Sequence, residues 1–506
     1  MIMMTSVFLS RVIGLFREMV IAHFGGAGGP VDAYQVAFVI PDILNHVVAS
    51  GFMSVTFIPI FSRYLAANQE DDGWNVFSIV LNCFGCFLVV LILVATVLTP
   101  QLIALIAPGL KNPGTITSAV RMTRIILPAQ LFFFVGGLLM AVQFSKERFF
   151  IPALAPLLYN LGIISGGIIL GPWIGMEGFA WGVLIGALIG NLLVQFFGVR
   201  KTGLQYFFIF NLGHPDLRKY VFLTLPLMIG MTMTFSTEFF FRLFGSYLPQ
   251  GSIAVLNFGL RIMLILVGLF GQAVGTASFP FLARLVAENK LSEMNRLLNQ
   301  TLRFIALVIP FSVLFMVLRS EVVRIIFQRG KFDTIATALT AEVLMYLLVG
   351  AFAFAAYTIV VRGYFASQDT LFPALYGTIV VILSIPLYLL AMNLLGVRGV
   401  ALAVSLSGIF QVTVLYALWN KRSNNTESRR VYAFYVKIIC FAVVLGIFLA
   451  WFKSAALFWI DSTTFYGSLM VCFLTGAVFL IILLTAGYGL KINEVTELVH
   501  RLVKRH

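Results

Sequence analysis

The stretch PIFSRYLAAN, at residues 59–68, returns in altered form as PFLARLVAEN at residues 280–289, which is 221 residues further along the chain. Other segments keep the same separation without a gap: FSKERFFIPAL (144–154) with FASQDTLFPAL (365–375), and GMEGFAWG (175–182) with GVRGVALA (396–403). Gly109 falls on Gly330 at that separation. A constant separation of this kind predicts two copies of one structural unit in the chain.

The composition places both copies in a membrane. The chain has 506 residues, of which 60% are hydrophobic and 11% charged, whereas soluble domains carry about 25% charged residues. Apolar runs long enough to cross a bilayer recur from end to end. They predict about fourteen spans in an all-α polytopic membrane protein, near residues 2–24, 32–64, 75–107, 116–145, 150–170, 174–199, 217–247, 253–286, 294–320, 335–366, 371–394, 396–420, 431–453 and 464–488.

The repeat divides these spans into parts. We expect an N-terminal six-helix bundle at 1–200, its repeat at 217–420, two extra transmembrane helices at 431–488 and a cytoplasmic tail at 489–506. Because six is an even number, the two bundles should be parallel and related by an axis along the membrane normal. Paired bundles of this kind are typical of secondary transporters, with the substrate at the interface between halves.

Small residues recur at every fourth position in corresponding spans of both halves. They are Gly178, Gly182 and Gly186 in the first half, and Gly399, Ala403 and Ser407 in the second. Spacing by four places each set on one stripe of a helix, where backbones can approach closely. We interpret both stripes as packing seams.

The net charge of +14 is explained by the loops. With the N-terminus inside, the cytoplasmic connections and tail hold about eighteen basic residues and the outer connections about seven, which is the positive-inside bias. Both termini should therefore be cytoplasmic. Nucleic-acid binding is not indicated, since no basic soluble module exists, and the absence of a GxxxxGK[ST] motif argues against ATP hydrolysis. No cofactor is indicated either, and the CFGC stretch at 83–86 lacks the second ligand pair of a metal site.

The stretch SRVIGLFRE, at 10–18, places charge inside the first span. On a helical wheel its polar and small residues share one arc of about 120°; they are Ser10, Arg11, Gly14, Arg17 and Glu18. Arg11 and Arg17 are separated by about 9 Å along the axis, so both could contact one bulky anion. The alternative is that Glu18 neutralises one of the arginines in a structural pair.

Further charges lie in other spans. Arg261 has no acidic residue in the surrounding run, which makes it the candidate anion contact of the second half. Asp32 could instead be an N-cap or an interface residue, and Glu238 and Arg242 are spaced for a local pair. Because arginine offers a planar fork of donors that suits phosphate, these positions predict an anionic substrate.

Several segments resemble the lipid II flippases of bacterial cell-wall synthesis, the MurJ or MviN type: SRVIGLFRE, DAYQVAFVIPDIL (32–44), FIPIFSRYL (57–65), RFFIPALAPLLYN (148–160), FQRGKF (327–332) and YFASQDTLFPAL (364–375). This family belongs to the multidrug, oligosaccharidyl-lipid and polysaccharide exporter superfamily. The resemblance implies a bacterial inner-membrane flippase for an undecaprenyl-pyrophosphate-linked peptidoglycan precursor, working by alternating access among membrane lipids, with cell-wall synthesis proteins as possible partners.

The resemblance also implies roles for single residues. The cavity arginines of the family match Arg11, Arg17 and Arg261, its acidic residue of span two matches Asp32, and the last two spans would form a groove for the lipid tail. Another family arginine falls on Asn45, beside His46, and the usual glutamate a turn later falls on Ser50. One cavity charge is therefore missing at Asn45. No Asp or Glu occurs in 371–420, so a sodium site there is not supported.

Three other functions remain open at this point. An exporter of another polyprenyl-pyrophosphate-linked oligosaccharide shares every physical argument and differs only in the family motifs. A cation or drug antiporter would need acidic rather than basic cavity residues. A non-transporting scaffold would not need Arg11, Arg17 or Arg261.

Overall fold

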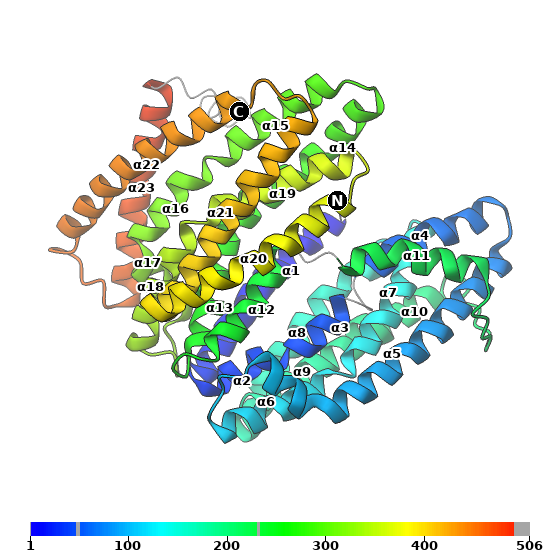
Figure 1. The fold of residues 1–506 in the computed structure, drawn as a ribbon. Helices are drawn as coiled ribbons and strands as arrows, with labels where there is room; N and C mark the ends of the chain where they lie inside the picture. The colour runs from blue at the N-terminus through cyan, green and yellow to red at the C-terminus, as the bar shows by residue number, and fades with distance from the viewer. Residues whose placement is uncertain (1, 47–50, 230–232, 490–506) are drawn as a thin grey trace. The chain divides into compact units, whose positions relative to one another are not determined.

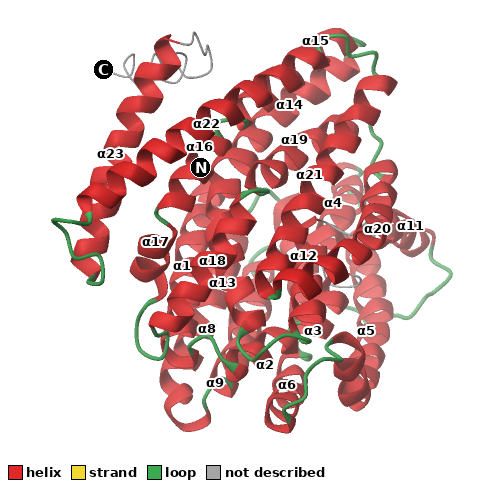
Figure 2. Cartoon of the chain, turned by 60° about the vertical axis from the view of Figure 1, so that its left-hand side comes forward, coloured by secondary structure: helices red, strands yellow, loops and turns green. Residues whose placement is uncertain are grey.

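The computed structural model describes residues 2–46, 51–229 and 233–489, which form helices and loops without a strand (Figures 1 and 2). The chain divides into two compact units. The first comprises Met1–Met231, Glu238–Ala254 and Arg329–Phe332, and the second Thr232–Thr237, Val255–Gln328 and Asp333–His506.

The helices of the first unit, with the junction helix α12 included, are α1 (Ile2–Gly25), α2 (Gly29–Ala37), α3 (Val39–Leu44), α4 (Gly51–Ala66), α5 (Glu70–Ile106), α6 (Pro113–Ile126), α7 (Ala129–Ser145), α8 (Phe150–Ile174), α9 (Glu177–Ala187), the π-helix η2 (Leu188–Leu193), α10 (Val194–Arg200), α11 (Pro215–Ile229) and α12 (Met233–Gly245). The helix α13 begins in the first unit and continues into the second. The helices of the second unit are α13 (Ser252–Val267), η3 (Gly268–Gln272), α14 (Ala273–Ala287), α15 (Leu291–Ile305), α16 (Val308–Val317), α17 (Arg319–Phe327), α18 (Thr334–Leu348), α19 (Ala351–Ala366), α20 (Leu371–Leu395), α21 (Val397–Arg422), α22 (Ser428–Ala456) and α23 (Phe465–Gly489).

Within the described residues, ten helical segments are long and apolar enough to cross a membrane, and α18 with α19, bent by 44°, would make eleven. The three other predicted spans fall on α1, which carries Arg11, Arg17 and Glu18, on the helices α2, α3 and α4, and on α11 with α12. The chain is thus an all-helical polytopic membrane protein, and the number fourteen stays a prediction. The predicted tail lies outside the described residues except for Gly489.

The separation of 221 residues reappears in the helix ends. Both ends of α8 and α20 correspond at this separation, and so do the last residues of α4 and α14. Residues with left-handed backbone also recur in pairs: Asn68 with Asn289, Glu147 with Gln368, Gly175 with Gly396, and Gly203 with Asn424. The side chains of Asn112 and Asp333, again 221 apart, cap α6 and α18 by accepting backbone N–H groups. These features support the duplication, while the division into two six-helix bundles stays a prediction.

The first glycine stripe packs α9 against α8. A Cβ atom on Gly182 would lie 2.6 Å from the carbonyl oxygen of Gly162 and 2.8 Å from the Cα of Ile163. A Cβ atom on Gly178 would lie 2.8 Å from the backbone nitrogen of Gly171 in α8. The predicted packing seam is therefore confirmed between these two helices, since only a hydrogen fits at these positions.

The connection between α10 and α11 is held against α5, and the start of α11 against α4, by two sets of polar contacts. Asn82 of α5 donates to the carbonyl oxygens of Phe207 and Ile209, at 3.1 and 3.0 Å. Asp216 accepts from Arg63, at 2.7 and 2.8 Å, and from Tyr64. Burial raises the pKa of Asp216, but the hydrogen bonds from Tyr64 and Arg63 outweigh it, so the net shift of the pKa is downward.

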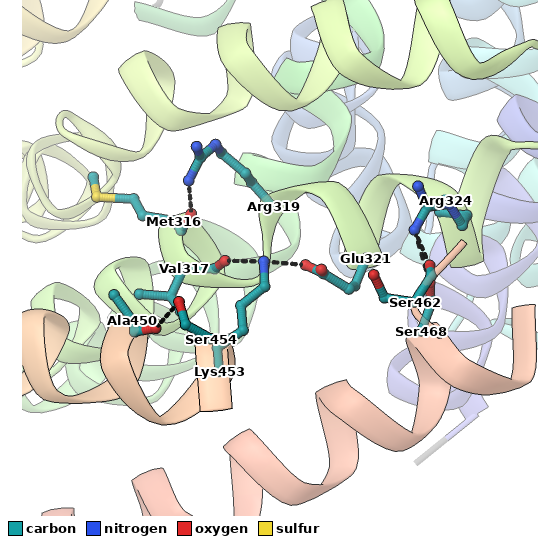
Figure 3. Close-up of polar contacts among 10 residues, drawn as sticks. All are labelled: Met316, Val317, Arg319, Glu321, Arg324, Ala450, Lys453, Ser454, Ser462 and Ser468. Carbon is teal, nitrogen blue, oxygen red and sulfur yellow. Dashed lines mark hydrogen bonds and ion pairs between the residues drawn. The ribbon is translucent and has the colours of Figure 1, made fainter. Parts of the chain in front are cut away.

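The two C-terminal helices are attached to α17 and the end of α16 by a polar clamp (Figure 3). The Lys453 ammonium of α22 donates to Glu321, at 2.7 Å, and to the carbonyl oxygen of Val317, at 2.9 Å. Arg324 donates to the hydroxyl of Ser468 in α23, at 3.1 Å, and to the carbonyl oxygen of Ser462. Glu321 is 3% exposed. Apolar side chains, including Leu314, Leu449 and Phe479, complete the attachment in the adjoining core.

Candidate functional site

The polar face of α1 lies against α8. Arg17 donates to Asn160 Oδ1 through Nη1, at 3.0 Å, and to Glu18 Oε1 through Nη2, at 2.6 Å. Asn160 in turn donates to the hydroxyl of Ser10, at 3.4 Å. Ser6, one turn before Ser10, donates to the carbonyl oxygen of Ala153. The wheel of residues 10–18 therefore predicted the correct face of the helix, because its polar side chains meet a polar residue of α8.

The charges on this face are unequally shielded. The side chain of Glu18 is 5% exposed and that of Arg17 is 21% exposed, whereas Arg11 is exposed. The structural alternative, in which Glu18 neutralises one arginine, holds for Arg17. The buried Nε of Arg17 nevertheless has no hydrogen-bond acceptor. This guanidinium is thus anchored through Nη1 and Nη2, and its buried Nε–H is available to another group.

Asp32 lies at the start of α2 and is buried. Its carboxylate accepts the backbone N–H of Gly251, at 2.5 Å, and that of Ala254, at 2.8 Å. Gly251 directly precedes α13 and Ala254 lies in its first turn, where backbone amides lack partners within the helix. Asp32 therefore caps a helix 219 residues away in sequence rather than its own helix.

Arg242 is 3% exposed and lies between two carboxylates. Its Nη2 is 3.7 Å from Glu238 Oε2, so the predicted local pair is confirmed. The same nitrogen donates to Asp42 Oδ2 at 3.1 Å, a partner that the sequence did not indicate. With two acids beside it, Arg242 adds no net positive charge.

The remaining candidates lie apart from this cluster in the chain. Arg261 is in the second unit, on the part of α13 that follows the Asp32 cap, and is half-buried. Asn45 is half-buried at the C-terminal end of α3. Ser50, the position of the missing family glutamate, lies outside the described residues. The seam between the two halves stays a prediction.

A protein-family model described as "Lipid II flippase MurJ" matches residues 21–470 of the chain. The chain belongs to the lipid II flippase MurJ family. It is accordingly a transporter rather than an enzyme, and a multi-pass protein of the bacterial inner membrane.

Curated relatives agree with this assignment. The chain is 28% identical over 426 residues to a probable lipid II flippase MurJ of Rhizobium tropici. That alignment covers 82% of this chain and 79% of the relative. It is 26% identical over 451 residues to a lipid II flippase MurJ of Burkholderia cenocepacia, which covers 88% and 87%.

Solved structures show the same fold. A lipid II flippase MurJ in an inward closed conformation aligns with a TM-score of 0.76 and 24% identity, over 96% of this chain and 99% of that one. An inward-facing multidrug resistance MATE transporter of the MOP superfamily aligns with a TM-score of 0.63 and 14% identity, over 84% and 95%.

Two polar residues of the MurJ-family chain were missed by the sequence analysis. Asn160 and Asp42 both interrupt apolar segments, PLLYNLGII (156–164) and FVIPDIL (38–44). An amide or carboxylate in such a run requires a partner, which is a usable signal. Their partners, however, lie 143 and 200 residues away in the sequence, at Arg17 and Arg242, so the sequence could not name them.

Proposed function

We propose that this chain turns lipid II from the inner to the outer leaflet by alternating access, with Arg11, Arg17 and Arg261 as contacts for the pyrophosphate. Membership of the MurJ family supports the lipid II substrate. The arginine assignment depends on one observation, the half-satisfied guanidinium of Arg17.

The geometry of Arg17 suits a transient anion. A buried donor without an acceptor costs about 1–3 kcal/mol, and a phosphate oxygen at Nε would remove that cost. Glu18 and Asn160 hold the side chain in place meanwhile. Because Arg11 is exposed and six residues away on the same helix face, it can add a second cation without moving Arg17.

We assign Asp32 a positioning role. Its cap fixes the first turn of α13, and Arg261 follows nine residues after Ser252, where that helix begins. Asp32 would therefore act on the pyrophosphate only through Arg261. Asn45 takes the place of a family arginine, and an amide can still donate a hydrogen bond there, although without charge.

The substrate is tested by complementation of a strain depleted of its lipid II flippase, in which the intact chain is expected to restore growth. If it reaches the membrane and does not restore growth, the lipid II assignment is wrong, and export of another polyprenyl-linked glycan becomes the better proposal. Arg11→Ala, Arg17→Ala and Arg261→Ala are each expected to abolish rescue.

The control is Arg398→Ala, because Arg398 is half-exposed and paired with Glu342 at 2.7 Å. This variant removes an arginine of the same chain from the surface and should rescue fully. Rescue by all three alanine variants at normal protein levels would refute the arginine mechanism while leaving the substrate assignment intact.

A further inference from the structure

A four-residue segment of the second repeat packs inside the first unit. Arg329–Phe332 lies between α17 and α18, and the chain on both sides of it belongs to the second unit. Phe332 is 1% exposed, so the segment is embedded and is not a loose surface loop. We call residues 329–332 the strap. It includes the glycine and the lysine of the FQRGKF stretch.

The strap is fixed to the end of α1 through the backbone. The Lys331 N–H donates to the carbonyl oxygen of His23, at 2.9 Å, which is one of the last four carbonyls of α1, a group that a helix leaves without an internal partner. A Cβ atom on Gly330 would lie 2.5 Å from that oxygen, and one on Gly26 would lie 2.7 Å from the carbonyl oxygen of Lys331. Since backbone atoms cannot swing aside as side chains do, only glycine fits at either position.

The same arrangement occurs 221 residues earlier, with the roles of the repeats exchanged. The loop 107–112 joins α5 to α6, and its Gly109 is the counterpart of Gly330. The Gly109 N–H donates to the hydroxyl of Ser246, at 3.1 Å, and a Cβ atom on Gly109 would lie 2.5 Å from the carbonyl oxygen of Ser246. Ser246 follows α12 directly and is the counterpart of Gly25, the last residue of α1. Each repeat thus rests a glycine loop on the helix end of the other repeat.

Both contacts fall at predicted outer ends of helices. With the N-terminus inside, as the positive-inside bias predicts, α1 reaches the outer surface near Gly25. His23 is six residues, or about 9 Å, beyond Arg17 on this helix. The strap therefore holds the helix that carries a proposed pyrophosphate contact, close to its outer end.

We propose that the strap and the loop 107–112 form a two-part outer latch, closed while lipid II is loaded from the inside and released when the site opens to the outside. The proposal depends on the alternating access proposed above. Each half includes one neutral hydrogen bond, a contact weak enough to break and re-form in every cycle. Because glycine meets backbone in both halves, no long side chain bridges a partial opening, and each half is either closed or released.

The test measures the distance between the strap and α6 by pulsed electron paramagnetic resonance on the purified full-length chain in lipid nanodiscs. Spin labels are attached at Thr117→Cys and Lys331→Cys, both exposed positions, after the four native cysteines are replaced by alanine. The Lys331 change keeps the backbone N–H that forms the contact. The intact latch should give one distance population. Gly330→Ala should increase the population of longer distances by about tenfold or more, because its Cβ meets the carbonyl oxygen of His23.

The matched control is Gly396→Ala. Gly396 has a φ of +58°, close to the +59° of Gly330, but nothing lies within 4 Å of a Cβ atom there. Both alanines therefore strain the backbone, and only Gly330→Ala meets a neighbour. An equal increase of the longer distances in the two variants would refute the latch, because strain rather than contact would then be the cause. An unchanged distance in Gly330→Ala would refute it as well.

A second variant tests the other half of the latch and does not depend on the folding of the first variant. Gly109→Ala should raise the same long-distance population, although Gly109 is not part of the strap, because both halves bias one opening motion. Gly137→Ala is its control, since nothing lies within 4 Å of a Cβ atom at that position. No change in Gly109→Ala relative to this control would refute the two-part latch.

These distances are measured without lipid II, so the two proposals fail separately. Unchanged distances would refute the latch and leave the substrate assignment intact. Failure of the intact chain to complement flippase depletion would refute the substrate assignment and leave the latch intact.

Discussion

Replacing Lys453 by methionine should destabilise the chain more than neutralising its partner Glu321 does. The change leaves the Glu321 carboxylate, 3% exposed, without its ammonium, and an uncompensated buried charge costs about 3–5 kcal/mol. In Glu321→Gln, by contrast, Lys453 keeps the Val317 carbonyl oxygen at 2.9 Å and its side chain is 16% exposed. We expect that variant to lose about 1–3 kcal/mol, which is the cost of one charged hydrogen bond.

The double variant Lys453→Met, Glu321→Leu removes both charges and keeps the bulk of both side chains. Replacing a buried ion pair by apolar residues of similar volume is often neutral or stabilising, so this variant should recover most of the stability. Thermal unfolding of the purified full-length chain in detergent would give the order of the melting temperatures. Arg398→Met is the control, because its pair with Glu342 is 48% and 39% exposed and such pairs contribute about 0–1 kcal/mol.

The reasoning fails if Lys453→Met unfolds at the same temperature as Arg398→Met. It also fails if the double variant is no more stable than Lys453→Met, because the loss would then come from packing of the lysine stem rather than from an orphaned carboxylate.

Three further predictions concern the first unit. Gly182→Leu should lower the free energy of unfolding by about 1–3 kcal/mol or more, because it overpacks the α8–α9 seam, and this loss should appear as a lower melting temperature. The control Gly137→Leu should change stability little, since nothing lies within 4 Å of a Cβ atom at that position. Asp32→Asn keeps an acceptor for the α13 cap, whereas Asp32→Ala loses the cap and about 0.5–2 kcal/mol of stability. Asp32→Asn should therefore complement flippase depletion better than Asp32→Ala. Equal failure of the two variants would favour a role for the charge itself. The pKa of Asp216 is lowered in the folded chain, so its ion pair with Arg63 should persist at neutral pH and be lost as the pH falls below about 3.8. In Asp216→Asn, the melting temperature should therefore fall less steeply with decreasing pH in the acid range.

Sequence periodicity predicted the helices well where the helices are continuous. The apolar run 150–170 became α8 and the run 371–394 became α20, and their ends correspond at the predicted separation. The prediction was weaker over residues 32–64, where α2 ends at Ala37 and a separate helix, α3, begins at Val39. Hydropathy measures only whether a segment is apolar, so it does not detect where one helix ends and the next begins within an apolar run.

The candidate site was predicted in its residue types and only partly in its contacts. The pair of Arg242 with Glu238 follows from i,i+4 helical spacing and is confirmed. The pair of Arg17 with Glu18 is one of the two alternatives that the sequence left open, and the structure contains it. The role of Asp32 was left open, and the cap on α13 depends on a contact across 219 residues. Such tertiary partners are fixed by how helices pack, which a single sequence does not specify.

If Arg17 contacts the pyrophosphate as proposed, its pairing with Glu18 explains how a flippase can keep an arginine in an apolar helix without binding its substrate permanently. A lipid-facing arginine at the centre of a span costs about 2.5–3.5 kcal/mol on the insertion scale, and a fully satisfied one offers nothing to a ligand. Arg17 lies between these limits, since Glu18 and Asn160 engage two of its nitrogens and Nε stays without an acceptor. In the proposed mechanism, a pyrophosphate would gain a contact at Nε and would compete with the Glu18 carboxylate for the charge of Arg17. We propose that this competition limits the affinity of the loaded state, because a carrier must release its lipid on the other side.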